Sequence, residues 1–124
     1  MKTLFLVFLG GGLGSVLRFI VGIYLNKPGP GLPYGTFAVN ILGSLFMGII
    51  LGFTLKNTAV PPQQTIFLAI GFCGGFTTFS AFAYENYVFL KTGDFMIFAI
   101  YTIASFAVGL LAVFAGLYIT KFLN

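Results

Sequence analysis

Four long apolar runs occupy almost the whole of this 124-residue chain and limit what it can fold into. They extend over residues 4–25, 35–55, 66–90 and 95–123, and short segments rich in proline, glycine or charge separate them. A helix needs about 20 mostly apolar residues to cross the hydrocarbon core of a bilayer. Each run therefore predicts one membrane-spanning helix. Together they predict an all-α membrane protein with a single transmembrane domain over residues 1–124.

Composition excludes several classes of protein. Hydrophobic residues make up 59% of the chain and charged residues only 6%, which is too little charge for the surface of a water-soluble domain. The six basic residues are spread along the chain and form no patch, so nucleic acid is not an expected partner. The chain has no histidine and one cysteine, Cys73, and it offers no metal-ligand cluster and no nucleophile–base pair. We therefore expect a protein that is not an enzyme.

The third apolar run contains an unusual stretch, GFCGGFTTFS at residues 71–80. Helix-weakening glycines and hydroxyl residues gather in it; these are Gly71, Gly74, Gly75, Thr77 and Thr78. Every backbone N–H and C=O in lipid needs a hydrogen-bond partner, so a broken helix persists there only where protein buries it or where it lines a cavity. Freed carbonyls and hydroxyls are also the groups from which ion sites are built. We therefore predict a helix break near residues 74–78 that belongs to a functional site.

The charges between the runs barely distinguish the two sides of the membrane. With four crossings, Lys2, Lys56 and Lys121 lie on one side and Lys27 and Lys91 lie on the other. Because cytoplasmic loops normally carry the excess of basic residues, so small a contrast hardly selects an orientation. Insertion in both orientations and insertion with both termini in the cytoplasm stay open as alternatives.

Four helices enclose no interior wide enough for a transport pathway, so a transport protein of this size should be an oligomer. Two copies in opposite orientations would form an antiparallel homodimer about a twofold axis in the membrane plane. Glycines spaced four residues apart would allow helices to approach closely. The pairs are Gly10 and Gly14, Gly48 and Gly52, and Gly71 and Gly75.

Three polar residues inside the runs are candidates for a site, because burying such side chains in lipid is costly. Arg18 either extends to the interface or draws anions to a vestibule. Asn40 either joins two helices or offers its NH₂ group to an anion in a pore. Glu85 is a proton-coupling carboxylate, a vestibule residue or an ordinary helix-end charge, and its place outside the middle of the run favours the last two.

Two phenylalanines follow the predicted break. Phe79 and Phe82 are three residues apart and share a helix face, with Ser80 beside them. Such a pair either packs against lipid and protein or turns its positive ring edges toward a dry path for a small anion. Tyr101, in the last run, would add a hydroxyl to that path. Other hydroxyls in the runs are weaker candidates, because each can bond the carbonyl of its own helix; these are Ser44, Thr102 and Ser105.

Three motifs of the chain resemble those of the small bacterial fluoride channels, the Fluc family, also called CrcB. They are GGGLGSVLRF at 10–19, GTFAVNILGSLFMG at 35–48 and, above all, GFCGGFTTFSAFAYE at 71–85. The likeness covers essentially the full chain. It implies a fluoride-selective channel that exports cytoplasmic fluoride passively and protects the cell from fluoride toxicity. It also implies an antiparallel, dual-topology homodimer with two pores in the bacterial inner membrane.

The resemblance further implies roles for individual residues. Phe79 and Phe82 match the pore phenylalanines and Asn40 the pore asparagine. Further pore-lining positions match Ser80, Tyr101 and Ser105. The vestibule positions match Arg18 and Glu85. The backbone carbonyls of Gly74 and Thr77, two from each subunit, would hold a structural Na⁺ on the twofold axis.

Two positions depart from the family pattern. Ala81 replaces a threonine that is common in the family motif, and Gly109 interrupts a possible track of hydroxyls on the last run. Neither residue can therefore contribute a hydroxyl to a pore.

Two other functions are alternatives. A dual-topology exporter of drugs or cations would use a membrane-embedded acid, usually in the first span, and this chain has none there. A non-transporting assembly subunit would use its polar residues only to join helices, and it would leave the clustered break and the paired phenylalanines unexplained.

Overall fold

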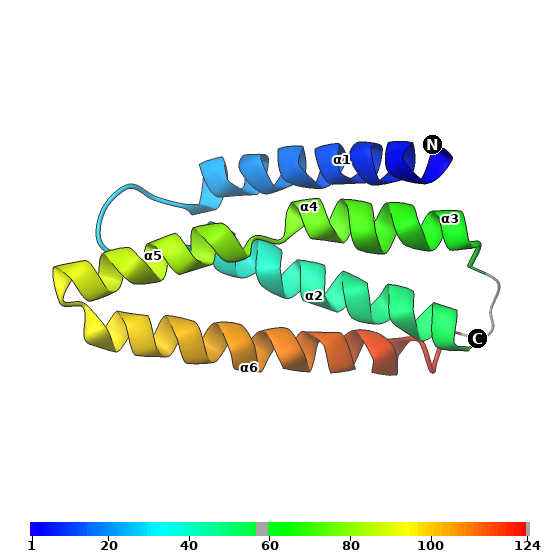
Figure 1. Cartoon of the computed structure of the whole chain (residues 1–124). Coiled ribbons are helices and arrows are strands. Elements are labelled where there is room, and N and C mark those ends of the chain that lie inside the picture. Colours follow the sequence, from blue (N-terminus) through cyan, green and yellow to red (C-terminus); the bar gives the residue numbers. More distant parts are fainter. Residues whose placement is uncertain (57–59, 124) are drawn as a thin grey trace.

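The computed structural model describes residues 1–56 and 60–123, and this part of the chain is helical without strands (Figure 1). The first two spans are α1 (Lys2–Leu25) and α2 (Tyr34–Leu55). The third combines α3 (Pro62–Thr65), the π-helix η1 (Ile66–Cys73), α4 (Gly74–Phe76) and α5 (Phe79–Thr92). The last is α6 (Phe95–Ile119). Four stretches are long and apolar enough to cross a membrane, which confirms the prediction of a four-span helical protein.

Both ends of the chain lie at the same end of the helix array in Figure 1, and the α1–α2 and α5–α6 connections lie at the other. Gly93 makes the sharp turn between α5 and α6 possible. Its φ of 81° lies in the left-handed region, where a residue with a Cβ is strained.

The helices pack in two main pairs, α2 against α6 and α1 against η1 and α4, and glycines lie at both contacts. A Cβ added to Gly14 would lie 2.7 Å from the backbone nitrogen of Phe76, and one added to Gly71 would lie 3.0 Å from the Cα atom of Gly10. On the other pair, a Cβ added to Gly116 would lie 2.7 Å from the backbone nitrogen of Ile49. Only glycine fits such backbone-to-backbone contacts, so the expected close approach of the helices is present.

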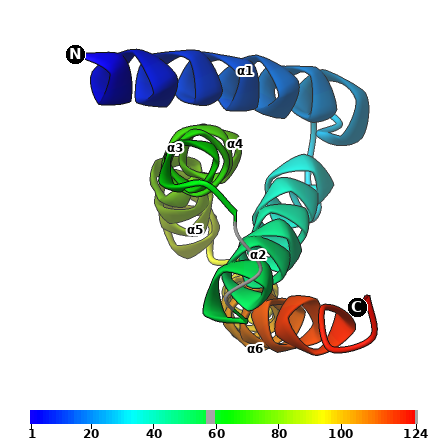
Figure 2. The same ribbon diagram turned by 90° about the vertical axis from the view of Figure 1, so that its right-hand side faces the viewer.

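The four spans form an open array and not a closed bundle. Figure 2 shows that α1 lies apart from α6, with α2 and the third span between them. In the most apolar part of α1 and of α6, only 11% of the residues are buried by the rest of the chain. Lipid or another subunit must therefore cover most of their apolar surface.

The third span is interrupted at two threonines, within the stretch where the sequence predicts a break. Thr77 has φ −79° and ψ 158° and Thr78 has φ −148° and ψ 118°, so both are extended. The three nearby glycines belong to helical segments, in η1 and α4. The break therefore lies at the two threonines of the predicted stretch and not at its glycines. Gly71 and Gly75 allow close packing on α1, and the break begins after them.

Candidate functional site

Asn40, on α2, holds the extended backbone of the third span. The N–H of Thr78 donates to Asn40 Oδ1 at 2.8 Å, and Asn40 Nδ2 donates to the carbonyl oxygen of Thr78 at 3.2 Å. One side chain thus satisfies both polar groups of a residue that leaves the helical ladder, which lipid cannot do. Asn40 therefore joins two helices. Its Nδ2 group has a second hydrogen that no hydrogen bond among the described residues uses.

Side chains on both sides of the break also bond backbone groups near it. Thr78 Oγ1 accepts from the N–H of Ala81 at 3.2 Å and so caps the start of α5. Thr77 Oγ1 donates to the carbonyl oxygen of Cys73 at 2.9 Å, at the end of the preceding helix. Arg18 Nε, on α1, donates to the carbonyl oxygen of Gly75 at 3.0 Å.

The arginine therefore has a structural contact that the sequence did not predict. It is half-buried and bonds the end of α4, which neither of the two alternatives for Arg18 includes. Ser15 Oγ lies 3.4 Å from the same Gly75 oxygen, so two side chains of α1 meet one carbonyl. Among residues 1–56 and 60–123, the carbonyl oxygens of Gly74 and Thr77 accept no hydrogen bond apart from any within the regular helices.

A cavity of about 240 Å³, which we call the phenylalanine cavity, opens beside the break. Its lining combines aromatic rings with uncharged polar groups and includes no ionisable side chain; the residues are Asn40, Ser44, Thr77, Thr78, Phe79, Phe82, Ser105 and Phe106. Ser44 Oγ donates to the carbonyl oxygen of Asn40 at 2.7 Å and is thus satisfied within α2, as its spacing predicts. Ser105 Oγ differs, because it is buried and has no hydrogen-bond partner in the described structure.

The phenylalanine rings have unequal environments. The centroids of Phe79 and Phe82 lie 5.9 Å apart with the rings tilted by 43°. Phe82 is only 8% exposed, because it packs against Tyr101 at 5.1 Å and nearly edge-on against Phe106 at 5.9 Å. Phe79 is 73% exposed and projects from the surface of the chain. Phe82 is therefore part of the core, whereas lipid or another protein chain must cover Phe79.

A second cavity, of about 170 Å³, has a charged lining that includes Arg18, Thr36 and Glu85. Glu85 Oε1 accepts from Thr36 Oγ1 at 2.6 Å, and Glu85 Oε2 accepts from the Tyr101 hydroxyl at 2.7 Å. Glu85 is not an ordinary helix-end charge, because α5 continues to Thr92 and two hydroxyls hold the carboxylate between the spans. We call this space the charged cavity.

The structure thus divides the predicted site residues between two cavities. The phenylalanine cavity contains Asn40, Phe79, Phe82, Ser105 and the side of Thr77, whereas the charged cavity contains Arg18 and Glu85. Tyr101 links the two, because its ring contacts Phe82 and its hydroxyl donates to Glu85. Two of the predicted residues line neither cavity and are exposed; these are Gly74 and Ser80.

Sequence reasoning missed two polar residues of this region. Thr36 is buried and bonds Glu85, and Asn86 is buried and accepts from Thr102 Oγ1 at 3.2 Å. A signal for Thr36 was present, because Thr36, Asn40 and Ser44 follow at intervals of four residues and so share one face of α2. For Asn86 no comparable pattern was available.

The chain has four apolar spans, an interrupted third helix and an uncharged polar cavity beside the interruption. These features are those of a multi-pass membrane protein of the transport class. Residues 5–117 match the model of the family described as CrcB-like protein, Camphor Resistance (CrcB), and the chain belongs to this family.

Relatives of nearly the same length agree with this assignment. The chain is 47% identical over 122 residues to the fluoride-specific ion channel FluC of Gloeothece citriformis, and the match covers 98% of each chain. It is 45% identical over 122 residues to the protein of that name from Flavobacterium psychrophilum, again over 98% of each. The family is one of fluoride ion channels, which confirms both the resemblance and the prediction that the chain is not an enzyme.

Proposed function

We propose that this chain is the subunit of a fluoride-selective channel that lets cytoplasmic fluoride leave a bacterial cell passively, through the inner membrane, and so limits fluoride toxicity. Membership in the CrcB family supports this proposal. The single structural observation that carries it is the unpartnered Ser105 hydroxyl in the phenylalanine cavity, whose lining has no ionisable group. A buried hydroxyl without a partner costs about 1–3 kcal/mol, so a bond from this hydroxyl to an anion would remove that cost.

The chemistry of this lining suits a small anion. The edges of Phe79 and Phe82 carry partial positive charge, Ser105 offers an O–H group, and Asn40 offers its remaining N–H group. These groups replace part of the ion's hydration shell, and none carries a full charge that would trap the anion. Arg18 and Glu85, in the charged cavity, would line a vestibule of the path, and Tyr101 continues the polar lining.

The functional unit in this proposal is an antiparallel homodimer with two pores, formed by chains inserted in both orientations. The 73% exposure of Phe79 supports it, because a pore residue cannot conduct from a lipid-facing surface and a second subunit would enclose the ring. The uncovered face of α1 supplies area for such contacts. A twofold axis in the membrane plane would build each pore from residues of both subunits.

A structural Na⁺ at the dimer axis is part of the same proposal. The backbone around the break fits such an ion. The carbonyls of Gly74 and Thr77 have no side-chain donor among the described residues. The neighbouring carbonyls of Cys73, Gly75 and Thr78 each have one. A Cβ added to Gly74 would meet nothing within 4 Å, so that backbone is open to a partner. The described residues contain no cluster of three His, Cys, Asp or Glu side chains, so the ligands would be backbone oxygens. Na⁺ would supply positive charge for carbonyls that lipid cannot bond.

The experiment that tests the function uses purified protein in liposomes loaded with fluoride or chloride and opened to a K⁺ shunt. We expect rapid release of fluoride and almost none of chloride. Equal release of both ions would contradict selectivity, and release only under a pH gradient would favour an exchanger. Protein-free liposomes are the control for leak.

A further inference from the structure

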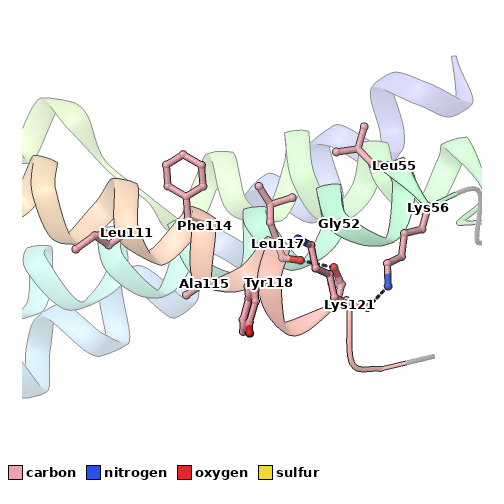
Figure 3. Close-up of a pocket in the computed structure, with 10 residues that line it drawn as sticks. Gly52, Leu55, Lys56, Leu111, Phe114, Ala115, Leu117, Tyr118 and Lys121 are labelled. Atoms are coloured by element: carbon pink, nitrogen blue, oxygen red, sulfur yellow. Dashed lines mark hydrogen bonds between the residues drawn. The ribbon is translucent and has the colours of Figure 1, made fainter.

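A groove of about 690 Å³ lies between the ends of α2 and α6, away from both cavities of the candidate site (Figure 3). Its walls are mostly apolar, with two lysines and a threonine at its end; the lining residues are Gly52, Leu55, Lys56, Leu111, Phe114, Ala115, Leu117, Tyr118, Thr120 and Lys121. Gly52 allows α2 and α6 to approach closely at this end, because a Cβ on Gly52 would collide with the Thr120 side chain.

The fold brings the two lysines together. Lys56 Nζ, at the end of α2, donates to the carbonyl oxygen of Thr120 at 2.6 Å and so caps the end of α6 (Figure 3). Lys121 follows Thr120 directly, and its Nζ lies 5.8 Å from the centroid of the Tyr118 ring. Of the three N–H donors of Lys56, that bond uses one. The groove therefore ends at two positive charges that keep hydrogen-bond donors for a ligand.

The chain itself covers little of the apolar part of the groove. Leu55 is 76% exposed, Leu111 65% and Phe114 59%. Both acidic side chains of the sequence belong to other regions, since Glu85 lies in the charged cavity and Asp94 lies in the α5–α6 connection. A ligand that fits this groove would combine a long apolar part with a negatively charged head.

We infer that this groove binds an anionic phospholipid, with one acyl chain along α6 and its phosphate at Lys56 and Lys121. Both lysines follow the last apolar turn of a span, which is the level of lipid headgroups in a bilayer. Basic residues at such positions attract anionic lipids, and pockets between spans bind their headgroups. Tyr118 packs edge-on against Phe122 at 5.0 Å next to Lys121, and tyrosine is enriched at membrane interfaces. This site does not depend on fluoride conduction.

A second copy of the chain matches the two lysines at the end of the groove less well than a lipid phosphate does. A parallel copy would place its own Lys2, Lys56 and Lys121 at this level, and an antiparallel copy would place Lys27 and Lys91 there against the single acid Asp94. Both arrangements add net positive charge next to the two lysines, whereas a lipid phosphate neutralises them.

Native mass spectrometry of the purified protein with phosphatidylglycerol and phosphatidylcholine of equal chain length tests the inference. We expect the wild-type protein to retain phosphatidylglycerol in preference. A lysine near the membrane surface contributes about fivefold to the binding of anionic lipid. Lys56→Gln with Lys121→Gln should therefore weaken retention of phosphatidylglycerol by about 25-fold and bring it near that of phosphatidylcholine. Glutamine removes the positive charge and keeps an N–H donor at each position.

Two further variants separate the parts of the site. Ala115→Trp should fill the groove and weaken binding of both lipids, because the acyl chain loses its place. Lys91→Gln is the matched control, since Lys91 lies 6.0 Å from the Tyr87 ring in a similar pairing but lies at the opposite end of the helix array, in the last turn of α5. It should leave retention unchanged. Equal retention of the two lipids by the wild type, or an equal loss in Lys91→Gln, would overturn the inference. Loss of oligomer mass in the lysine double variant would also overturn it, because the groove would then be an interface between copies.

Discussion

Replacement of Asn40 by leucine should destabilise the protein at the break in the third span. The side chain makes two hydrogen bonds to the backbone of Thr78, at 2.8 Å and 3.2 Å, and leucine makes neither. A buried backbone group without a partner costs about 1–3 kcal/mol, so the loss of both bonds should lower the free energy of unfolding by about 2–6 kcal/mol.

Two measurements report this effect. Denaturant titration in detergent gives the free energy of unfolding, and amide exchange at Thr78 gives the local opening. A loss of about 2 kcal/mol corresponds to roughly 30-fold faster exchange. The matched control is Ser44→Ala, one turn further along α2, whose hydroxyl bonds only the carbonyl of its own helix at 2.7 Å. If Asn40→Leu unfolds like Ser44→Ala and the Thr78 amide stays protected, the side chain does not hold the break.

Three further predictions test other parts of the account. Phe79→Ile and Phe82→Ile should both suppress fluoride flux while dimers still form. Only Phe82→Ile should also lower thermal stability, because Phe82 packs on Tyr101 and Phe106. Normal flux in both variants would show that these rings only pack. Gly14→Ala should lower the free energy of unfolding by more than about 2 kcal/mol, because its Cβ would meet the α4 backbone. Gly12→Ala, whose Cβ would meet nothing within 4 Å, should be neutral or slightly stabilising. Equal effects of the two variants would contradict the close contact. Replacement of Na⁺ by a large organic cation on both sides of a bilayer should abolish fluoride current, and an unchanged current would exclude the proposed cation site.

Much of the fold could be predicted from the sequence because membrane insertion depends on local properties. Length and hydropathy alone define a span, so the runs that lead to α1, α2 and α6 were recognisable without tertiary information. The position of the break was also foreseeable, but its cause was not. Glycine has a low helix propensity, yet in a membrane its lack of a side chain equally serves close packing, and Gly71 and Gly75 serve α1 in this way.

The contacts of the candidate site depend on how the spans align with one another, which residue patterns do not specify. Asn40 meets Thr78 across 38 positions of sequence, and Arg18 meets Gly75 across 57. The bond from Tyr101 to Glu85 likewise requires a particular alignment of α6 with α5. A side chain's polarity identified each of these residues as a candidate, but only the packed structure identifies the partner that each one satisfies.

The most direct test of the conduction proposal compares two hydroxyls on α6 in the liposome fluoride assay. Ser105 Oγ is buried without a partner beside the phenylalanine rings, whereas Thr102 Oγ1 donates to Asn86 at 3.2 Å. Loss of one hydrogen bond to an ion in transit, about 1.4 kcal/mol, should slow fluoride release about tenfold in Ser105→Ala. Thr102→Ala should release fluoride at nearly the wild-type rate. Equal rates for Ser105→Ala and the wild type would contradict the proposal that the phenylalanine cavity is the path of the anion.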